Sequence, residues 1–333
     1  MNCVKNREIR LKVFVLNLFS RYLCPNMLNR IKIAVRFVQF YWRAKTRYDV
    51  HSPFVFQFVE EVLEDDRLFY VFRDAEILRG ELLNAKDSVE VEDFGAGSHV
   101  SGLKKTRKIS AIANAALSPA FQCEWLFRIA QFTKPLTVIE LGTSLGVSTL
   151  YLTEGSPRSA KIRTLEGSSD IAALARRNFD WYYDTFLKIG LQRHNPDMLD
   201  FNYYEKNVKS DFEKNKIQIV VGKFDETLQT TLTELQKIDF AFIDGNHRRQ
   251  PTLDYFHQCL AHTHEGSVLI FDDIHWSTEM ESAWKDIKQH PSVRLTIDLF
   301  WCGLVFFRTE NREKEHFSLI KSAWKPYAWG FWG

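Results

Sequence analysis

The stretch that decides the fold is Thr137–Thr149, which reads TVIELGTSLGVST. Its first five residues form a mainly apolar run, as expected for a buried parallel strand. Gly142 and Gly146 then open a turn, and the segment that follows is typical of a helix start. This order predicts a place where backbone approaches a nucleotide-like ligand and where free helix N–H groups can meet an anion.

A second glycine-rich stretch, VEVEDFGAGSHVSG, competes for this assignment. A cofactor site of this kind wants an acidic residue about 20 residues further on, at the end of the next strand. Glu166 satisfies that spacing from Gly142, whereas the next apolar strand after Gly95 is TVIEL itself, too far along the chain. We therefore predict that Asp93–Ser101 is a loop, either an exposed structural loop or one that covers an active site.

From residue 120 onward, apolar runs alternate with helix-like segments, which indicates an α/β fold with a doubly wound, mainly parallel, seven-stranded Rossmann-like sheet. The link at Trp301–Gly303 between the last two apolar segments is very short, so these strands are expected to form a C-terminal antiparallel hairpin that ends the sheet in one reversed strand. The predicted strands cover 136–141, 161–166, 217–222, 238–244 and 267–273 besides the hairpin, and the predicted helices cover 120–133, 147–154, 170–189, 225–236, 250–262 and 278–289.

The predicted domain organisation has two parts. Residues 1–119 form a mostly helical N-terminal extension or cap, in which Ser52-Pro53 is a helix start. Residues 120–333 form the sheet domain, with an insertion at about 190–216 that is either a lid or interface or a plain surface excursion. Five scattered cysteines with no close pair argue against a zinc ribbon or a disulfide scaffold and predict a cytoplasmic protein.

The first fifty residues are strongly basic, with eleven Lys or Arg residues against two acidic ones. The segment LKVFVLNLFSRYL at 11–23 is shorter than the roughly 20 apolar residues that cross a membrane. It is expected either to pack on its own domain as an amphipathic helix or to contact a membrane surface peripherally. Nucleic acid is the less expected partner, and a homodimer stays open.

Polar side chains follow several of the predicted strands, at the edge where ligands bind in such sheets. A carboxylate such as Glu166 can accept hydrogen bonds from both hydroxyls of a ribose. Ser148, in the first helical turn, can bond a ligand carboxylate at the positive end of the helix dipole. The other strand ends carry Gly222–Phe224, Asp244–His247 and Asp272–Trp276.

Five ordered motifs, ELGTSLGVS, TLEG, VVG, FIDGNH and FDD, resemble the class I S-adenosylmethionine-dependent methyltransferases, most closely the catechol-type O-methyltransferases that act on small molecules. The resemblance implies that the turn approaches the methionine part of S-adenosylmethionine, that Ser148 binds its carboxylate, that Glu166 holds the ribose and that Gly222–Phe224 lies near the adenine. The implied cofactor-binding residues are Glu140, Gly142, Thr143, Ser144, Gly146, Ser148, Glu166, Gly167, Gly222, Phe224 and Asp244.

The resemblance also implies a divalent cation, since Asp244, Asp272 and Asp273 stand where cation-dependent members hold Mg²⁺. Three carboxylates near one point repel each other unless a cation lies between them, and oxygen ligands favour Mg²⁺, Mn²⁺ or Ca²⁺. His247 stands where those members have a Lys general base, so His247 and Asp244 are the implied catalytic residues. Purely structural roles for these residues stay open, and His275 and Trp276 either line the substrate pocket or cap and pack.

The function predicted from the sequence is methyl transfer from S-adenosylmethionine to a hydroxyl of a small-molecule acceptor, with cation assistance. Two alternatives are a non-catalytic protein of the same fold that binds membrane or RNA, and an NAD-dependent oxidoreductase. The turn reads G-x-x-x-G, not the G-x-G-x-x-G of dinucleotide-binding proteins, which argues against the oxidoreductase.

Overall fold

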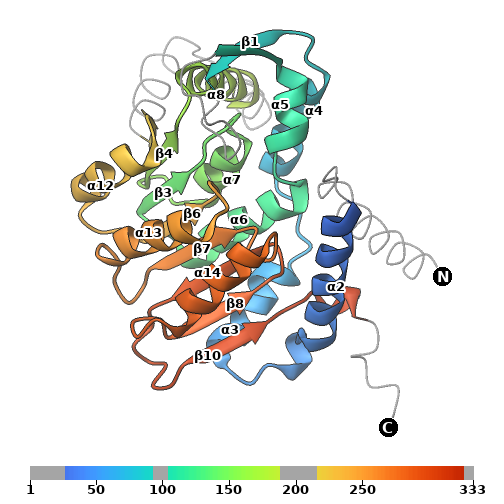
Figure 1. Ribbon diagram of the computed structural model, residues 1–333, viewed down its shortest axis with the longest axis vertical. Coiled ribbons are helices and arrows are strands. Elements are labelled where there is room, and N and C mark those ends of the chain that lie inside the picture. The colour runs from blue at the N-terminus through green and yellow to red at the C-terminus, as the bar shows by residue number, and fades with distance from the viewer. Residues whose placement is uncertain (1–26, 93–103, 188–215, 326–333) are drawn as a thin grey trace, which may run out of the picture. The chain divides into compact units, whose positions relative to one another are not determined.

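The computed structural model describes residues 27–92, 104–187 and 216–325 (Figure 1). The predicted loop at 93–101, the insertion at 190–216 except for its last residue, and the basic segment at 11–23 lie outside these ranges. By packing, the chain divides into two compact units. The first comprises residues 1–67, 247–253 and 268–333, and the second comprises residues 68–246 and 254–267.

The second unit is built on four parallel strands in the order β6-β3-β4-β5. These are β3 (Thr137–Leu141), β4 (Lys161–Glu166), β5 (Ile217–Val221) and β6 (Phe240–Ile243). Val138, Ile139 and Leu141 of β3 are fully buried, as expected for a strand with a neighbour on each side and helices on its faces. Leu141 pairs with Leu165 of β4 and with Ile243 of β6, so these three strands end level with one another.

Helices α7 (Val147–Gly155), α8 (Ser169–Tyr182) and α12 (Phe224–Leu235) lie between these strands along the chain, as the sequence predicted, and α8 continues into a π-helical turn at Tyr183–Leu187. Helix α6 (Ala120–Thr133) precedes β3, and α13 (Arg249–Leu260) follows β6. The prediction of an α/β fold with a mainly parallel sheet is confirmed.

Residues 68–119 pack inside the second unit. Helices α4 (Tyr70–Asn84) and α5 (Ile109–Ala116) share one hydrophobic core with α6, α7 and α8. The Phe72 ring stacks on Tyr151 of α7 at 5.6 Å between centroids, and the Tyr151 hydroxyl donates to Glu76 at 3.1 Å. The division into two compact units does not fall at residue 119. The predicted domain boundary at that residue stays a prediction.

A small antiparallel hairpin in this unit escaped the sequence-based prediction. Strand β1 (Ser88–Glu92) pairs with β2 (Lys104–Lys108), with Glu90 opposite Thr106. The segment KKTRK carries no apolar residue, so nothing in its hydrophobic pattern indicates a strand. Its backbone pairing with the SVEVE segment is what makes it one.

The first unit contains four further strands in the order β10-β8-β9-β7. Strand β7 (Val268–Asp272) pairs antiparallel with β9 (Cys302–Phe306), which pairs antiparallel with β8 (Leu295–Asp298). The predicted hairpin is therefore confirmed. The sheet has one strand more than predicted, because β10 (Glu315–Ser318) pairs parallel to β8, so the reversed strand β9 does not end it.

Helices of the first unit are α2 (Met27–Arg43), α3 (Pro53–Phe58) and α14 (Thr278–Gln289). Ser52 is the N-cap of α3 with Pro53 in its first turn, as predicted, and a π-helical turn, Val59–Leu63, continues it. The Ser277 hydroxyl caps α14 by accepting a hydrogen bond from the Met280 N–H at 3.1 Å. Within the described ranges, none of the helices has the length and apolar character needed to cross a membrane.

Candidate functional site

The turn after β3 requires glycine at two positions, Gly142 and Gly146. Gly142 and Gly146 have φ values of +106° and +85°, which L-residues rarely adopt. A Cβ on Gly142 would collide with the backbone carbonyl of Asp244, and a Cβ on Gly146 would collide with the Phe179 ring. The turn therefore lies directly against the end of β6.

The turn leads straight into the N-terminus of α7. Gly146 is the N-cap and has no side chain to bond the first N–H groups of the helix. The Gly146 carbonyl accepts the first intrahelical hydrogen bond, from Leu150 at 3.1 Å. The N–H groups of the first turn and the positive end of the helix dipole are therefore open to a ligand carboxylate.

Glu166 ties the end of β4 to this turn. One carboxylate oxygen accepts from the Ser144 N–H at 2.9 Å, and the other accepts from the Ser168 N–H at 3.0 Å. Burial raises the pKa of Glu166, while the N–H groups of Ser168, Ser144 and Gly167 oppose that shift. The carboxylate is therefore held in place by backbone donors on both of its oxygens.

Glu140 is the fully buried acid of the site. Its carboxylate accepts hydrogen bonds from the hydroxyls of Ser148 at 2.7 Å, Thr149 at 2.5 Å and Thr164 at 2.7 Å. Burial raises the pKa of Glu140 to about 7, the three hydroxyls oppose the rise, and nearby Asp244 adds to it. The Ser148 hydroxyl, predicted to bind a ligand carboxylate, thus already has an acceptor inside the protein.

Thr149 and Thr164 were missed by sequence reasoning. Both are completely buried, and Thr164 also shares a hydrogen bond of 2.6 Å with Thr143. The signal available was Thr164 itself, at alternate spacing with Ile162 on β4, next to a strand that carries Glu140. A buried hydroxyl in such a place needs a polar partner, which the facing acid supplies.

The ends of β5 and β6 place an aromatic ring beside the turn residues of this unit. Gly222 has a φ of +144° and donates its N–H to the Glu166 carbonyl at 2.9 Å. The half-buried Phe224 ring lies over Gly245, where a Cβ would be only 2.6 Å from the ring. Asp244 is half-buried, and its N–H donates to the Leu141 carbonyl at 3.0 Å. The Phe224 ring thus packs on Gly245, and its place near an adenine stays a prediction.

His247, Asp272 and Asp273 belong to the first unit, whereas Asp244 belongs to the second. Asp272 and Asp273 are buried, and Asp273 has an unusual φ of +54°. His247 also has a positive φ, of 22°. Among the described residues, no group of three or more His, Cys, Asp or Glu side chains is arranged to hold a metal ion. The cation site and the role of His247 stay predictions.

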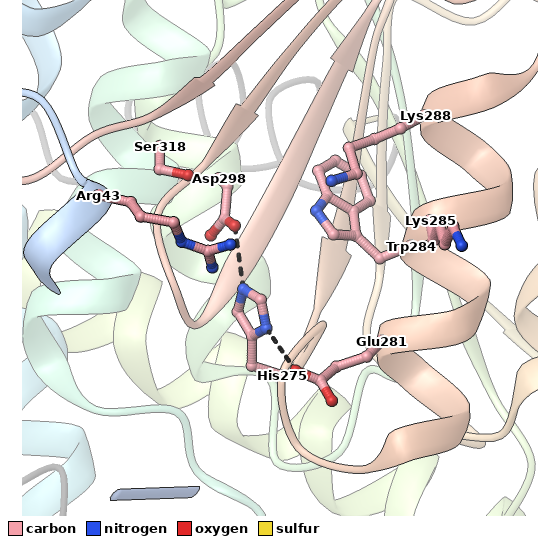
Figure 2. A pocket seen from close by; sticks show the side chains of 8 residues that line it. All are labelled: Arg43, His275, Glu281, Trp284, Lys285, Lys288, Asp298 and Ser318. Atoms are coloured by element: carbon pink, nitrogen blue, oxygen red, sulfur yellow. Dashed lines mark hydrogen bonds and ion pairs between the residues drawn. The ribbon is translucent and has the colours of Figure 1, made fainter. Parts of the chain in front are cut away.

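His275 occupies a charged cluster of the first unit (Figure 2). Its Nε2 lies 3.0 Å from Asp298 and its Nδ1 lies 3.4 Å from Glu281, while its ring stacks on Phe300 at 5.2 Å between centroids. Burial lowers the pKa of His275, but the two carboxylates outweigh it and raise that pKa to about 9. His275 is therefore an imidazolium at neutral pH. Its second carboxylate partner, Glu281, also pairs with Arg36 at 2.8 Å.

The glycine turn lies inside a segment that matches a known protein family. Residues 139–274 match a family model described as a methyltransferase domain. This segment is a methyltransferase domain. The family resemblance predicted from ELGTSLGVS and the motifs after it is confirmed for this segment, which begins inside β3 and ends just after β7.

Two curated relatives resemble parts of this chain. A catechol O-methyltransferase of Niastella koreensis is 25% identical over 154 residues, which cover 46% of this chain and 56% of the relative. An O-methyltransferase of Aspergillus hancockii, hkm8, is 42% identical over 65 residues, which cover 19% of this chain and 25% of the relative. The chain thus spans about half the length of the first relative and a quarter of the second.

Solved structures of similar fold include the SAH-bound Podospora anserina methyltransferase PaMTH1, at 15% identity and a TM-score of 0.48, with 78% of this chain and 97% of that chain covered. Another is the O-methyltransferase from Bacillus cereus in complex with SAH, at 19% identity and a TM-score of 0.44, with 76% and 96% covered.

Proposed function

We propose that this protein is an S-adenosylmethionine-dependent O-methyltransferase that acts on a hydroxyl of a small molecule. The observation that carries the proposal is the arrangement of the second unit's strand ends. There, a backbone-anchored Glu166 carboxylate, a Cβ-free turn at Gly142 and an uncapped N-terminus of α7 lie together. The names of the two curated relatives support oxygen as the acceptor atom.

These residues fit each part of the cofactor. The N–H groups of α7 would bind its carboxylate, since no side chain caps them. Glu166 would accept hydrogen bonds from the ribose hydroxyls, because both of its oxygens are already oriented by N–H donors. Phe224 would pack on the adenine. Bound S-adenosylmethionine supplies an electrophilic methyl group.

Glu140 takes a supporting part in this proposal. Its carboxylate orients the hydroxyls of Ser148 and Thr149 in the first turn of α7, so it fixes the helix start against β3 and β4. On the acceptor side, we propose that His247 accepts the proton of the acceptor hydroxyl, as an imidazole can near neutral pH. A divalent cation held by the buried carboxylates of Asp272 and Asp273 is a separate part of the proposal, tested by activity before and after chelation.

Isothermal titration calorimetry with S-adenosylmethionine tests the cofactor assignment. We expect saturable binding to the full chain at one site, and its loss in Gly142→Ala, because the added Cβ meets the Asp244 carbonyl. Gly80→Ala is the matched control, since a Cβ at Gly80 of α4 meets nothing within 4 Å. Absence of binding to wild-type protein with an intact circular dichroism spectrum would refute the proposal.

The acceptor needs a different experiment. A set of small phenols, catechols and aliphatic alcohols, incubated with methyl-labelled cofactor, should yield labelled ether products that wild-type protein forms and Gly142→Ala does not. Label found only on nitrogen or carbon would contradict the oxygen assignment while leaving cofactor binding intact.

A further inference from the structure

A cavity of about 270 Å³ in the first unit is lined by cations from two helices (Figure 2). Arg43 comes from the last turn of α2, and Lys285 and Lys288 come from α14. Ser318, at the end of β10, adds a hydroxyl to the lining. The cavity is therefore rich in hydrogen-bond donors.

The two carboxylates of the cavity are already matched. Asp298 and Glu281 flank the His275 imidazolium, and Glu281 also pairs with Arg36. By contrast, Arg43, Lys285 and Lys288 form no ion pair within the part of the chain that the structure describes. Burial lowers the pKa of Lys288, Asp298 opposes this, and Arg43 lowers it further. Among the described residues, none of these three cations is thus held in an ion pair.

A buried indole N–H points to a missing acceptor at the same place. Trp284 is 3% exposed, and its Nε1 has no hydrogen-bond partner among the described residues. Figure 2 shows this nitrogen on the side of the ring that faces the cavity. The ring cannot turn away freely, because its other edge packs against Gly303, where a Cβ would be 2.6 Å away. A buried donor without a partner is unfavourable, and an acceptor in the cavity would remove that cost.

We propose that this cavity binds the phosphate group of a small molecule. A phosphate dianion carries two negative charges, which match those of Arg43 and Lys288, and it has acceptor oxygens for the two neutral donors, Trp284 Nε1 and the Ser318 hydroxyl. A monovalent carboxylate would leave most of these donors unmatched. The proposal does not depend on the proposed methyl transfer, because its residues all lie in the first unit and its test uses no cofactor.

Calorimetry with inorganic phosphate on the full chain tests the site. We expect binding at one site, weakened about tenfold in Lys288→Met and by a similar factor in Trp284→Phe, which keeps the aromatic packing and removes the N–H. Lys237→Met is the matched control, because Lys237 is an exposed lysine of the second unit. This variant should bind phosphate as tightly as the wild type.

Three results would overturn the assignment. The first is no saturable phosphate binding by folded wild-type protein. The second is equal weakening in Lys237→Met, which would mean that net charge and not the cavity binds the anion. The third is acetate binding as tightly as phosphate, which would replace the phosphate group by a carboxylate.

A second, independent observation concerns helix α2, which has apolar residues on two opposite faces. Ile33 and Phe40 are buried at 4% and 2% exposure and belong to one face. The other face is offset by two residues, which is about 200° around a helix. It carries a stripe of exposed apolar side chains at helical spacing, namely Ile31, Val35, Val38 and Trp42, which are 52%, 50%, 52% and 70% exposed.

We infer that this exposed stripe lies on an anionic membrane surface. Large exposed apolar side chains in a row mark an interaction surface. The surrounding sequence supplies the matching charge, with eleven Lys or Arg residues against two acidic ones in residues 1–50, of which Lys32 and Lys45 are exposed. Basic helices with a Trp on the apolar side bind in the headgroup layer, aided by about 1 kcal/mol per basic residue near anionic lipid.

Co-sedimentation with vesicles tests this surface. The full chain should bind vesicles that contain phosphatidylserine, bind phosphatidylcholine vesicles several-fold less, and lose most binding when Val35→Ser and Trp42→Ser are combined. Leu136→Ser is the matched control, because Leu136 is a 55% exposed leucine of the second unit. No vesicle binding, or a dimer in sedimentation velocity that the double variant abolishes, would contradict the membrane assignment.

Discussion

Two buried carboxylates of this protein are neutralised in opposite ways. Glu140 in the second unit has only neutral donors, the hydroxyls of Ser148, Thr149 and Thr164. Asp298 in the first unit faces the His275 imidazolium at 3.0 Å. With neutral donors the pKa of the acid itself rises, to about 7 for Glu140. With a cationic partner the pKa of the base rises instead, to about 9 for His275.

The difference teaches which kind of partner each cluster needs for its task. A carboxyl that rests on hydroxyls fixes the start of α7 without placing a full positive charge beside the proposed cofactor site. In the first unit, the carboxylates of Asp298 and Glu281 pair with the His275 imidazolium. The other cations that line the cavity therefore have no ion-pair partner among the described residues. The two clusters should therefore respond differently to substitution and to pH.

The largest expected effect is that of Asp298→Ala. The substitution removes the nearer carboxylate partner of His275, which keeps only Glu281, and it removes the acceptor of the buried Phe300 N–H at 2.8 Å. We expect the free energy of unfolding in urea to fall by about 3–5 kcal/mol. Asp298→Asn, which keeps the shape, should cost less and bring the pKa of His275 back toward 6.5, measured by NMR titration. An unchanged titration would mean that Asp298 does not set this pKa.

The next effect is a dependence of stability on pH from Glu140. Its folded pKa of about 7 lies above the ordinary glutamate value of 4.5, so the folded state holds the proton more tightly than the unfolded state. This contribution is complete below pH 4.5 and is lost as the pH rises through 7, about 3 kcal/mol in all. Urea unfolding of wild type and Glu140→Gln between pH 4.5 and 8 measures it as the difference between the two proteins. A difference that stays constant with pH would contradict the raised pKa.

A smaller effect is expected from removing one hydroxyl. Thr164→Val keeps the volume of the side chain and deletes one of the three donors to Glu140. Stability at pH 8 should fall by about 1–2 kcal/mol, because a charged acceptor loses one hydrogen bond. At pH 4.5, where the carboxyl is protonated, the loss should be smaller. Thr233→Val, on the exposed face of α12, is the control that should change neither value.

Much of this molecule follows from sequence pattern alone. The buried run of β3, the glycines at 142 and 146 and the spacing to Glu166 predicted the turn, and the short link at Trp301–Gly303 predicted the hairpin of β8 and β9. These features are local or depend on a fixed spacing. The strands β2 and β10 could not be predicted, because their stability comes from pairing with β1 and β8 and not from an apolar pattern of their own.

The site was predictable to the level of which strand ends carry it. The partners of its acids were not, because they depend on which side chains face each other across strands. Thr164 reaches Glu140 from the neighbouring strand, and Asp298 reaches His275 from a strand end that had no assigned role. Ser148 shows the same limit, since its place at the helix start was right while its hydrogen-bond acceptor is Glu140.

The most direct test of the cofactor assignment combines a change in the ligand with a change in the protein. Calorimetry would compare S-adenosylhomocysteine with its analogue lacking both ribose hydroxyls, in the wild type, Glu166→Gln and Glu140→Gln. We predict that the wild type and Glu140→Gln bind the analogue at least about tenfold more weakly, and that Glu166→Gln loses most of this discrimination. Full discrimination in Glu166→Gln, or its loss in Glu140→Gln, would contradict the assignment of Glu166 as the residue that holds the ribose.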